Sequence, residues 1–274
     1  MRIGAALAAL ALLLGGCAMA PGTLPDGVSV AVYQPRTEIA SGRLAIQVRN
    51  GGDAPLEVMA ATFHSPAFRD PLAWEAGRTV EIAPGTAVDL RIPAGVADCD
   101  ADRFAGSVVL EFASDGQRGS ASLEPEDEFG IVRQLHDTGC LAERAAAVAR
   151  LSTTGIEGGG TGTPGELVVS IEPSGEGALE LVAVRSTTLL APAVDGTGMP
   201  SVELGVTVGR DGPHELRIPI VPNRCDPHAL AEDKVGTRIP VEIRGDGFEG
   251  RIVLEATDDA RATMRAFFAT YCGL

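Results

Sequence analysis

The chain has 274 residues, enough for two domains that each bury a core of their own. Its formal net charge of −15 argues against nucleic acid or an anionic membrane surface as an electrostatic partner, and a solvated acidic surface explains the charge most simply. Hydrophobic residues make up 45% of the chain and aromatic residues only 4%, alongside 34 Gly and 18 Pro, which favours short strands and turns over long helices.

The N-terminus has the pattern of an export signal. Met1-Arg2-Ile3 is a short basic start, and an uninterrupted apolar run follows over residues 5–14. A helix of that length would reach only about 15 Å, against about 30 Å of hydrocarbon, so the run is too short for a permanent membrane span. It ends in Leu14-Gly15-Gly16-Cys17, which resembles the bacterial lipobox, where two small residues precede the cysteine to be acylated. An ordinary signal peptide with an incidental cysteine is the alternative.

The resemblance to the lipobox implies that residues 1–16 are a signal peptide cleaved before Cys17. Cys17 would then carry two or more acyl chains, palmitate among them, which hold a protein stably on a membrane. Residues 17–27 are rich in Gly and Pro and are expected to be a lipidated tether. We therefore expect a protein on the extracytoplasmic face of the cell membrane. The many Arg and Ala residues and the single lysine, Lys234, resemble proteins of high-GC bacteria such as actinobacteria.

The rest of the chain is an internal repeat. Leu90-Arg91-Ile92-Pro93 precedes Cys99-Asp100, and Leu216-Arg217-Ile218-Pro219 precedes Cys225-Asp226 at the same spacing. Two further blocks align without gaps, residues 42–58 with 165–181 and residues 110–124 with 241–255. Three blocks in the same order argue against chance similarity, so we predict two repeated units, over residues 28–140 and 141–274.

Both units have the alternation of apolar and polar residues that strands require, as at Leu44, Ile46 and Val48. The strands predicted for the first unit cover residues 28–33, 44–48, 56–63, 87–92 and 107–112. Those predicted for the second cover 167–171, 179–185, 214–218 and 238–243, with a weaker opening strand over 145–151. Two hairpin tips, Asp115-Gly116 and Asp246-Gly247, are expected to supply the positive φ of tight turns.

About seven short strands in a unit of this size match a β-sandwich. The segment Asn50-Gly51-Gly52-Asp53-Ala54-Pro55-Leu56-Glu57-Val58 between two strands resembles bacterial immunoglobulin-like and fibronectin-III-like modules. The resemblance implies an all-β protein with two tandem immunoglobulin-like sandwiches. Residues 260–270 could instead form a short helix with three apolar residues on one face. The Gly-rich segment 153–165 is either a linker or a long loop, and the alignment of the repeats favours the loop.

The chain has five cysteines. With Cys17 acylated, two remain in each unit, one after the Leu-Arg-Ile-Pro strand and one near the end of the unit. Export places them in an oxidising compartment, so we predict the disulfides Cys99–Cys140 and Cys225–Cys272. A metal site is the alternative, but neither pair has Cys-x-x-Cys spacing and no histidine recurs beside them.

No pattern of catalytic residues is present. The histidines have no counterparts in the other unit and form no metal-ligand motif; they are His64, His136, His214 and His228. Asp98, Asp100 and Asp102 resemble a calcium loop but lack its glycine and its bidentate glutamate, which favours a turn or cap role. We therefore predict no catalytic residue, no metal and no cofactor.

The sequence thus favours a membrane-anchored lipoprotein that acts as a non-catalytic binding or scaffold module, with an envelope protein as partner. A lipoprotein that binds a small molecule or a glycan, as an accessory to a transporter, is the alternative. A third hypothesis is an enzyme whose site is assembled between the two units.

Overall fold

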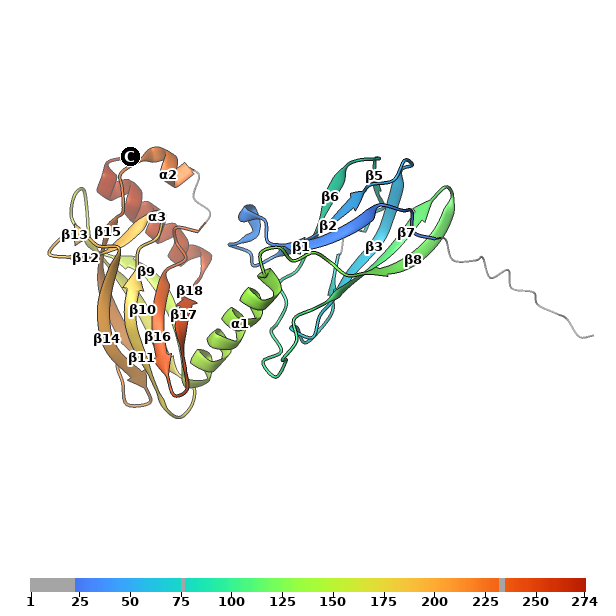
Figure 1. Cartoon of the computed structure of the whole chain (residues 1–274). Coiled ribbons are helices and arrows are strands. Elements are labelled where there is room, and N and C mark those ends of the chain that lie inside the picture. Colours follow the sequence, from blue (N-terminus) through green and yellow to red (C-terminus); the bar gives the residue numbers. More distant parts are fainter. Residues whose placement is uncertain (1–22, 75–76, 232–234) are drawn as a thin grey trace, which may run out of the picture.

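The computed structural model describes residues 23–74, 77–231 and 235–274 (Figure 1). Two β-sandwiches, each built from two sheets of mainly antiparallel strands, follow one another along the chain, which confirms the predicted all-β class and its pair of sandwich domains. The expected signal peptide and the lipidation site Cys17 lie outside the described residues. Within the described ranges, no helix is both long and apolar enough to cross a membrane.

The first domain packs two sheets face to face. One sheet has the order β1-β2-β6, and the other has the order β4-β3-β7-β8 with β5 also paired to β3. Its strands are β1 (Val28–Tyr33), β2 (Leu44–Asn50), β3 (Leu56–His64), β4 (Leu72–Ala73), β5 (Val80–Ile82), β6 (Ala87–Ile92), β7 (Ser107–Ser114) and β8 (Gln117–Leu123), and a 3₁₀ turn η1 (Arg36–Glu38) links β1 to β2. Leu44, Ile46 and Val48 are fully buried, as the alternation predicts.

The second domain repeats this topology. Its sheets have the orders β13-β12-β15-β10-β9-β18 and β14-β11-β16-β17. Its strands are β9 (Ala149–Glu157), β10 (Gly165–Pro173), β11 (Ala178–Arg185), β12 (Leu190–Val194), β13 (Thr197–Gly198), β14 (Ser201–Gly209), β15 (Glu215–Pro222), β16 (Pro240–Gly245), β17 (Phe248–Val253) and β18 (Glu255–Ala256), with a short helix α2 (Pro227–Ala231) after β15.

The two sequence halves therefore correspond strand by strand. β1-β2-β6 reappears as β9-β10-β15, and β3-β7-β8 reappears as β11-β16-β17. These orders match the A-B-E and C-F-G strands of immunoglobulin sandwiches. The outer edge of the first strand is also closed in the same way, by a parallel bridge from Glu126 to β1 and by the parallel strand β18 beside β9.

The hairpin tips follow the prediction in part. Asp115 and Gly116 both have positive φ, 51° and 75°, as a two-residue turn between β7 and β8 requires. In the second domain Gly247 has a φ of 73°, whereas Asp246 is not in the left-handed region. In the turn between β16 and β17, only Gly247 therefore has the positive φ that was expected of both residues.

Each domain ends in a helix. The helix predicted over 260–270 is α3 (Asp258–Cys272), which buries Met264, Phe267 and Phe268 against the second core. The hydroxyl of Thr257 accepts a hydrogen bond from the Ala260 N–H and caps its first turn. The Gly-rich segment lies inside the second domain, as the alignment favoured, but only residues 158–164 form a loop. Residues 153–157 belong to β9, which ends at Glu157, and β10 begins at Gly165.

The helix α1 (Ile131–Val148) ends the first domain and was not predicted. The opening strand expected over 145–151 is wrong in its first half, because residues 145–148 complete α1 and β9 begins only at Ala149. The alanine-rich stretch 145–147 has high helix propensity, which explains the correction. The expected boundary between residues 140 and 141 falls inside this helix.

Both hydrophobic cores include part of α1. Ile131 and Val132 belong to the core of the first domain, while Ala145 belongs to the core of the second, with Leu141 and Val148 packed against it. Figure 1 shows the helix running from the end of the first sandwich down along the second. A continuous helix that is part of two cores fixes the two domains relative to each other.

Candidate interdomain site

The structure contains both predicted disulfides. Cys99–Cys140, with an S–S distance of 2.10 Å, joins the segment after β6 to α1. Cys225–Cys272, at 2.08 Å, joins the segment after β15 to α3. The two bonds occupy equivalent places in the repeat, and each ties the terminal helix of its domain to the sandwich.

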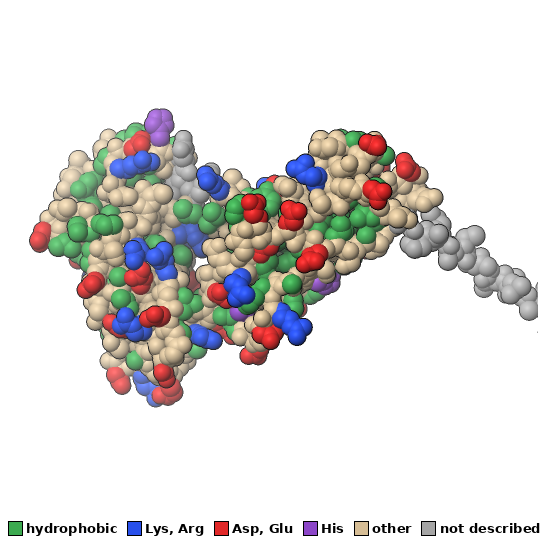
Figure 2. Space-filling model, viewed as in Figure 1, with side chains coloured by type: hydrophobic (Ala, Val, Ile, Leu, Met, Phe, Trp, Pro, Cys, Tyr) green, Lys and Arg blue, Asp and Glu red, His purple; other side chains and the backbone are tan. Residues whose placement is uncertain are grey.

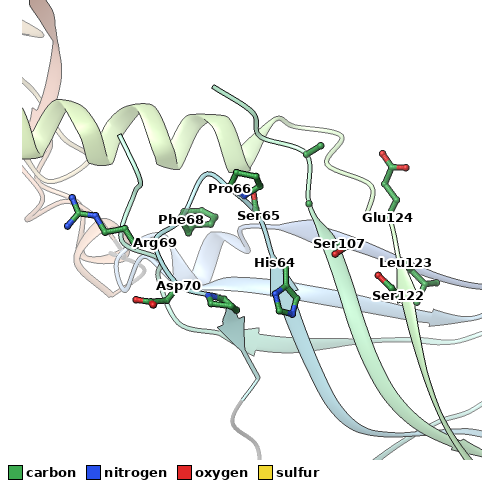
Figure 3. A pocket seen from close by; sticks show the side chains of 13 residues that line it. His64, Ser65, Pro66, Phe68, Arg69, Asp70, Ser107, Ser122, Leu123 and Glu124 are labelled. Carbon is green, nitrogen blue, oxygen red and sulfur yellow. The ribbon is translucent and has the colours of Figure 1, made fainter. Parts of the chain in front are cut away.

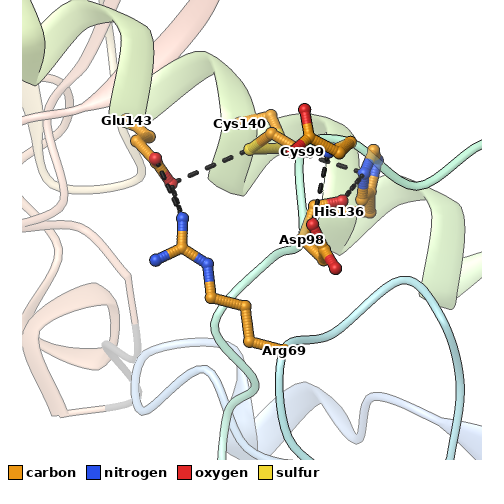
Figure 4. Close-up of polar contacts among 7 residues, drawn as sticks. Arg69, Asp98, Cys99, His136, Cys140 and Glu143 are labelled. Carbon is orange, nitrogen blue, oxygen red and sulfur yellow. Dashed lines mark hydrogen bonds and ion pairs between the residues drawn. A yellow bond between two sulfur atoms is a disulfide. The ribbon is translucent and has the colours of Figure 1, made fainter.

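Polar contacts around Cys99–Cys140 attach α1 to the first domain (Figure 4). The ring of His136 is buried; its Nδ1 lies 2.9 Å from Asp137 Oδ1 and its Nε2 lies 3.0 Å from the backbone oxygen of Asp98. The guanidinium of Arg69 donates to both carboxylate oxygens of Glu143 at 2.9 Å. The helix is therefore held by a disulfide, a buried histidine and an ion pair within three turns.

The opposite side of α1 fits closely against the second domain. Leu141 faces Gly250 of β17, and a Cβ on this glycine would lie only 2.7 Å from Leu141 Cδ2. A second contact lies at the other end of the interface, where Arg238 Nη1 donates to the backbone oxygen of Ala40 at 2.9 Å. Burial there lowers the pKa of the Arg238 guanidinium from its ordinary value. The interface thus depends on both close packing and a partly desolvated charge.

A groove of about 560 Å³ lies between α1 and the β16–β17 hairpin. Both basic and acidic side chains line it, Arg144 and Asp137 from the helix and Arg251 and Glu249 from the hairpin, and Phe248 supplies an aromatic ring. Beside the groove, Arg185 Nε donates to Glu242 Oε1 at 2.6 Å, and this hydrogen bond, together with the charges of Arg185 and Arg251, lowers the pKa of the Glu242 carboxyl. Such a surface can recognise a polar partner through paired charges around an apolar centre.

A second hollow, of about 610 Å³, lies in the first domain (Figure 3). It forms where β3 ends and β7 begins, so that His64 and Ser107 stand opposite each other in the register of the two strands. Ser122, Leu123 and Glu124 complete its wall, and Figure 3 shows their side chains at its rim. The lining mixes polar and apolar side chains and is open to solvent.

The remaining candidate residues lie apart. His214 and His228 are exposed and belong to the second domain, whereas the buried His136 contacts Asp98 of the first domain. Asp98 Oδ1 accepts a hydrogen bond from the Asp100 N–H at 3.3 Å, which is the turn role expected of this acidic segment. In the part of the chain that the structure describes, no group of three or more His, Cys, Asp and Glu is placed to hold a metal ion.

Sequence reasoning did not find the residues that make the interface. Leu141 and Gly250 meet across 109 positions of the chain, and neither belongs to a motif. Gly250 aligns with Gly119 of the first unit, and this alignment indicates a position in a hairpin. It does not indicate a contact between the domains. The signals available for α1 were the i, i+4 spacing of Ile131 and Leu135 and the helix propensity of the alanine-rich stretch 145–147.

No protein-family model and no curated protein matches the chain. Among solved structures, it is similar to the CsuC–CsuE chaperone–tip adhesion subunit pre-assembly complex from archaic chaperone-usher Csu pili of Acinetobacter baumannii, with a TM-score of 0.21 and 10% identity over 84% of this chain and 100% of that chain. It is also similar to red sea bream transglutaminase, with a TM-score of 0.22 and 11% identity over 84% of this chain and 31% of the transglutaminase chain. Similarity at this level does not extend to function.

Proposed function

We propose that this chain is an exported lipoprotein, anchored through Cys17 on the extracytoplasmic face of the membrane, and that its two sandwiches form a non-catalytic binding module for another envelope protein. The observation that supports this proposal is the helix α1, which is part of both hydrophobic cores. Domains within one chain move relative to each other by default unless their interface is substantial. A shared helix makes the two domains present one composite surface.

The groove between α1 and the β16–β17 hairpin is the part of that surface best suited to a protein partner. Its exposed charges, Arg144 and Glu249, lie around the half-buried ring of Phe248. Protein interfaces combine an aromatic or apolar centre with a polar rim in the same way. An envelope protein with complementary charges would bind here without any catalytic step.

Photo-cross-linking in living cells tests this function. A photoreactive residue is placed at Arg144 or at Glu249 in the groove, and as a matched control at the exposed Thr207 on β14, the strand at the opposite edge of the same sheet. We expect both groove positions to capture one and the same envelope protein and Thr207 to capture none. Capture that is equal at all three positions, or no capture from a folded and abundant protein, would contradict the proposal.

The anchor is tested separately by Cys17→Ala. Loss of the acylated side chain should move the protein from the detergent phase to the aqueous phase of a phase partition. A variant that stays in the detergent phase would show that another feature holds the protein on the membrane.

A specific observation favours a second candidate function. The hollow beside His64 and the interdomain groove, at about 610 and 560 Å³, have the volume of small-molecule sites. A lipoprotein that binds a small molecule or a glycan for a transporter would use one of them. A rise in Tm with a metabolite or sugar, lost on His64→Ala or Arg144→Ala, would favour this function over a protein partner.

A further inference from the structure

We propose that two copies of this chain associate through the free edge of β8, as an antiparallel strand pair that joins their first-domain sheets across a two-fold axis. This inference does not depend on the envelope partner proposed above. It rests on a difference between the two halves of the repeat, on the composition of β8 and on its charges.

The equivalent edge strands of the two domains have different surroundings. In the second domain, β17 packs against α1, and Leu141 approaches Gly250. In the first domain, β8 ends its sheet, and no strand pairs with its outer edge within the described ranges. Figure 1 shows β8 at the outer rim of the first sandwich, away from α1. The edge strand is therefore packed against a helix in the second domain, whereas the equivalent edge strand β8 of the first domain is uncovered.

Strand β8 has few of the features that normally protect an edge, Arg118 being its one charged residue. Its sequence, Gln-Arg-Gly-Ser-Ala-Ser-Leu, contains no proline and no lysine, and its pairing with β7 is regular over the whole strand. Its inward side chains Ala121 and Leu123 are only half-buried, whereas Leu110 and Phe112 on the neighbouring β7 are fully buried. A further strand beside β8 would cover this incomplete margin of the core.

The charged residues on β8 and directly after it, Arg118 and Glu124, can pair with those of a second copy. Antiparallel pairing over the full strand places Ser120 on the two-fold axis and puts Arg118 opposite Ser122 of the second copy. Arg118 then lies diagonal to Glu124 of the second copy, on the same face of the sheet and within reach of a long side chain. Both residues are exposed, and neither has an ion pair in the described part of the chain. The two-fold axis forms this ion pair twice.

Charge reversal tests the pairing in the full-length protein in mild detergent, with sedimentation velocity as the readout. Arg118→Glu and Glu124→Arg should each weaken the dimer by about tenfold, because two attractive diagonal pairs become repulsive. The double variant Arg118→Glu/Glu124→Arg should restore the dimer, since it only exchanges the two charges. A double variant as weak as the single ones would overturn the proposed pairing.

Cross-linking tests the register. In Ser120→Cys, the two introduced cysteines face each other with Cα atoms about 5 Å apart, within the reach of a disulfide. In the matched control Ser122→Cys they lie about 14 Å apart along the strand and should not react. We expect a disulfide-linked dimer from Ser120→Cys alone. A wild-type protein that is monomeric at its highest soluble concentration refutes self-association; this is also the result expected if a strand from a different protein pairs with β8. Equal cross-linking of both variants refutes the register.

Discussion

Asn50 shows how a single buried amide determines a local structure. Its Nδ2 donates to the backbone oxygens of Ala54 at 2.8 Å and Ile82 at 2.9 Å, and its Oδ1 accepts from the Gly52 N–H at 3.0 Å. The sequence already placed residues 50–53 between two predicted strands, where the chain turns from β2 to β3. The bond to Ile82 could not be predicted, because that residue lies on β5, more than 30 positions away, and nothing in its type marks it as a partner.

Replacement of this amide should destabilise the first domain. Asn50→Ala removes three hydrogen bonds, among them the buried bond to the Ile82 carbonyl, so the free energy of unfolding should fall by about 2–4 kcal/mol. The exposed Asp53 in the same turn is the control, and Asp53→Ala should change it by less than about 0.5 kcal/mol. Denaturant unfolding followed by circular dichroism measures both. Equal losses in the two variants would mean that the bonds of Asn50 do not stabilise the fold.

At the scale of elements, α1 and α3 occupy the same place in the repeat and have different partners. α3 ends at Cys272, where Gly273 at a φ of 67° stops it, and it packs on β9 of its own domain. α1 continues past Cys140 to Val148, and this extension packs on β17 of the other domain. Helical spacing can predict that a segment has one apolar face, but not which domain will cover that face. Strands such as β2 and β7 could be predicted because period-two alternation needs only local sequence, although β12 and β14 were not predicted. The helix that joins the domains was not predicted either.

The two disulfides should accordingly have different effects. They close loops of 41 and 47 residues, so loss of either should lower the free energy of unfolding by a similar amount, about 2–4 kcal/mol. Only the first bond holds the helix between the domains. Small-angle X-ray scattering should show a larger maximum dimension for Cys99→Ser/Cys140→Ser, and an unchanged one for Cys225→Ser/Cys272→Ser. The same expansion in both variants would contradict the idea that only the Cys99–Cys140 disulfide holds the two domains in position.

At the scale of the whole molecule, two open sandwiches and one shared helix form a single extended body (Figure 2). The duplicated motif could be read from sequence, as could the disulfide pairs and the strands with clear alternation in each domain. The pairing of those strands into sheets could not. The angle between the domains depends on contacts such as Leu141 with Gly250 and Arg238 with Ala40, whose residues carry no joint signal in a single sequence. The composite groove between the domains exists only because those contacts hold.

The distance distribution between the two domains shows whether α1 holds them in one arrangement. Spin labels at the exposed positions Asp53 and Asp211, one in each domain, allow it to be measured by double electron–electron resonance. We expect one narrow distribution in the wild-type protein. We expect a broad one in Leu141→Asp, where a charge is placed against Gly250 and separates the helix from the second domain. A wild-type distribution already as broad as that of Leu141→Asp would show that the domains move independently, and the interdomain groove would then not be a defined site.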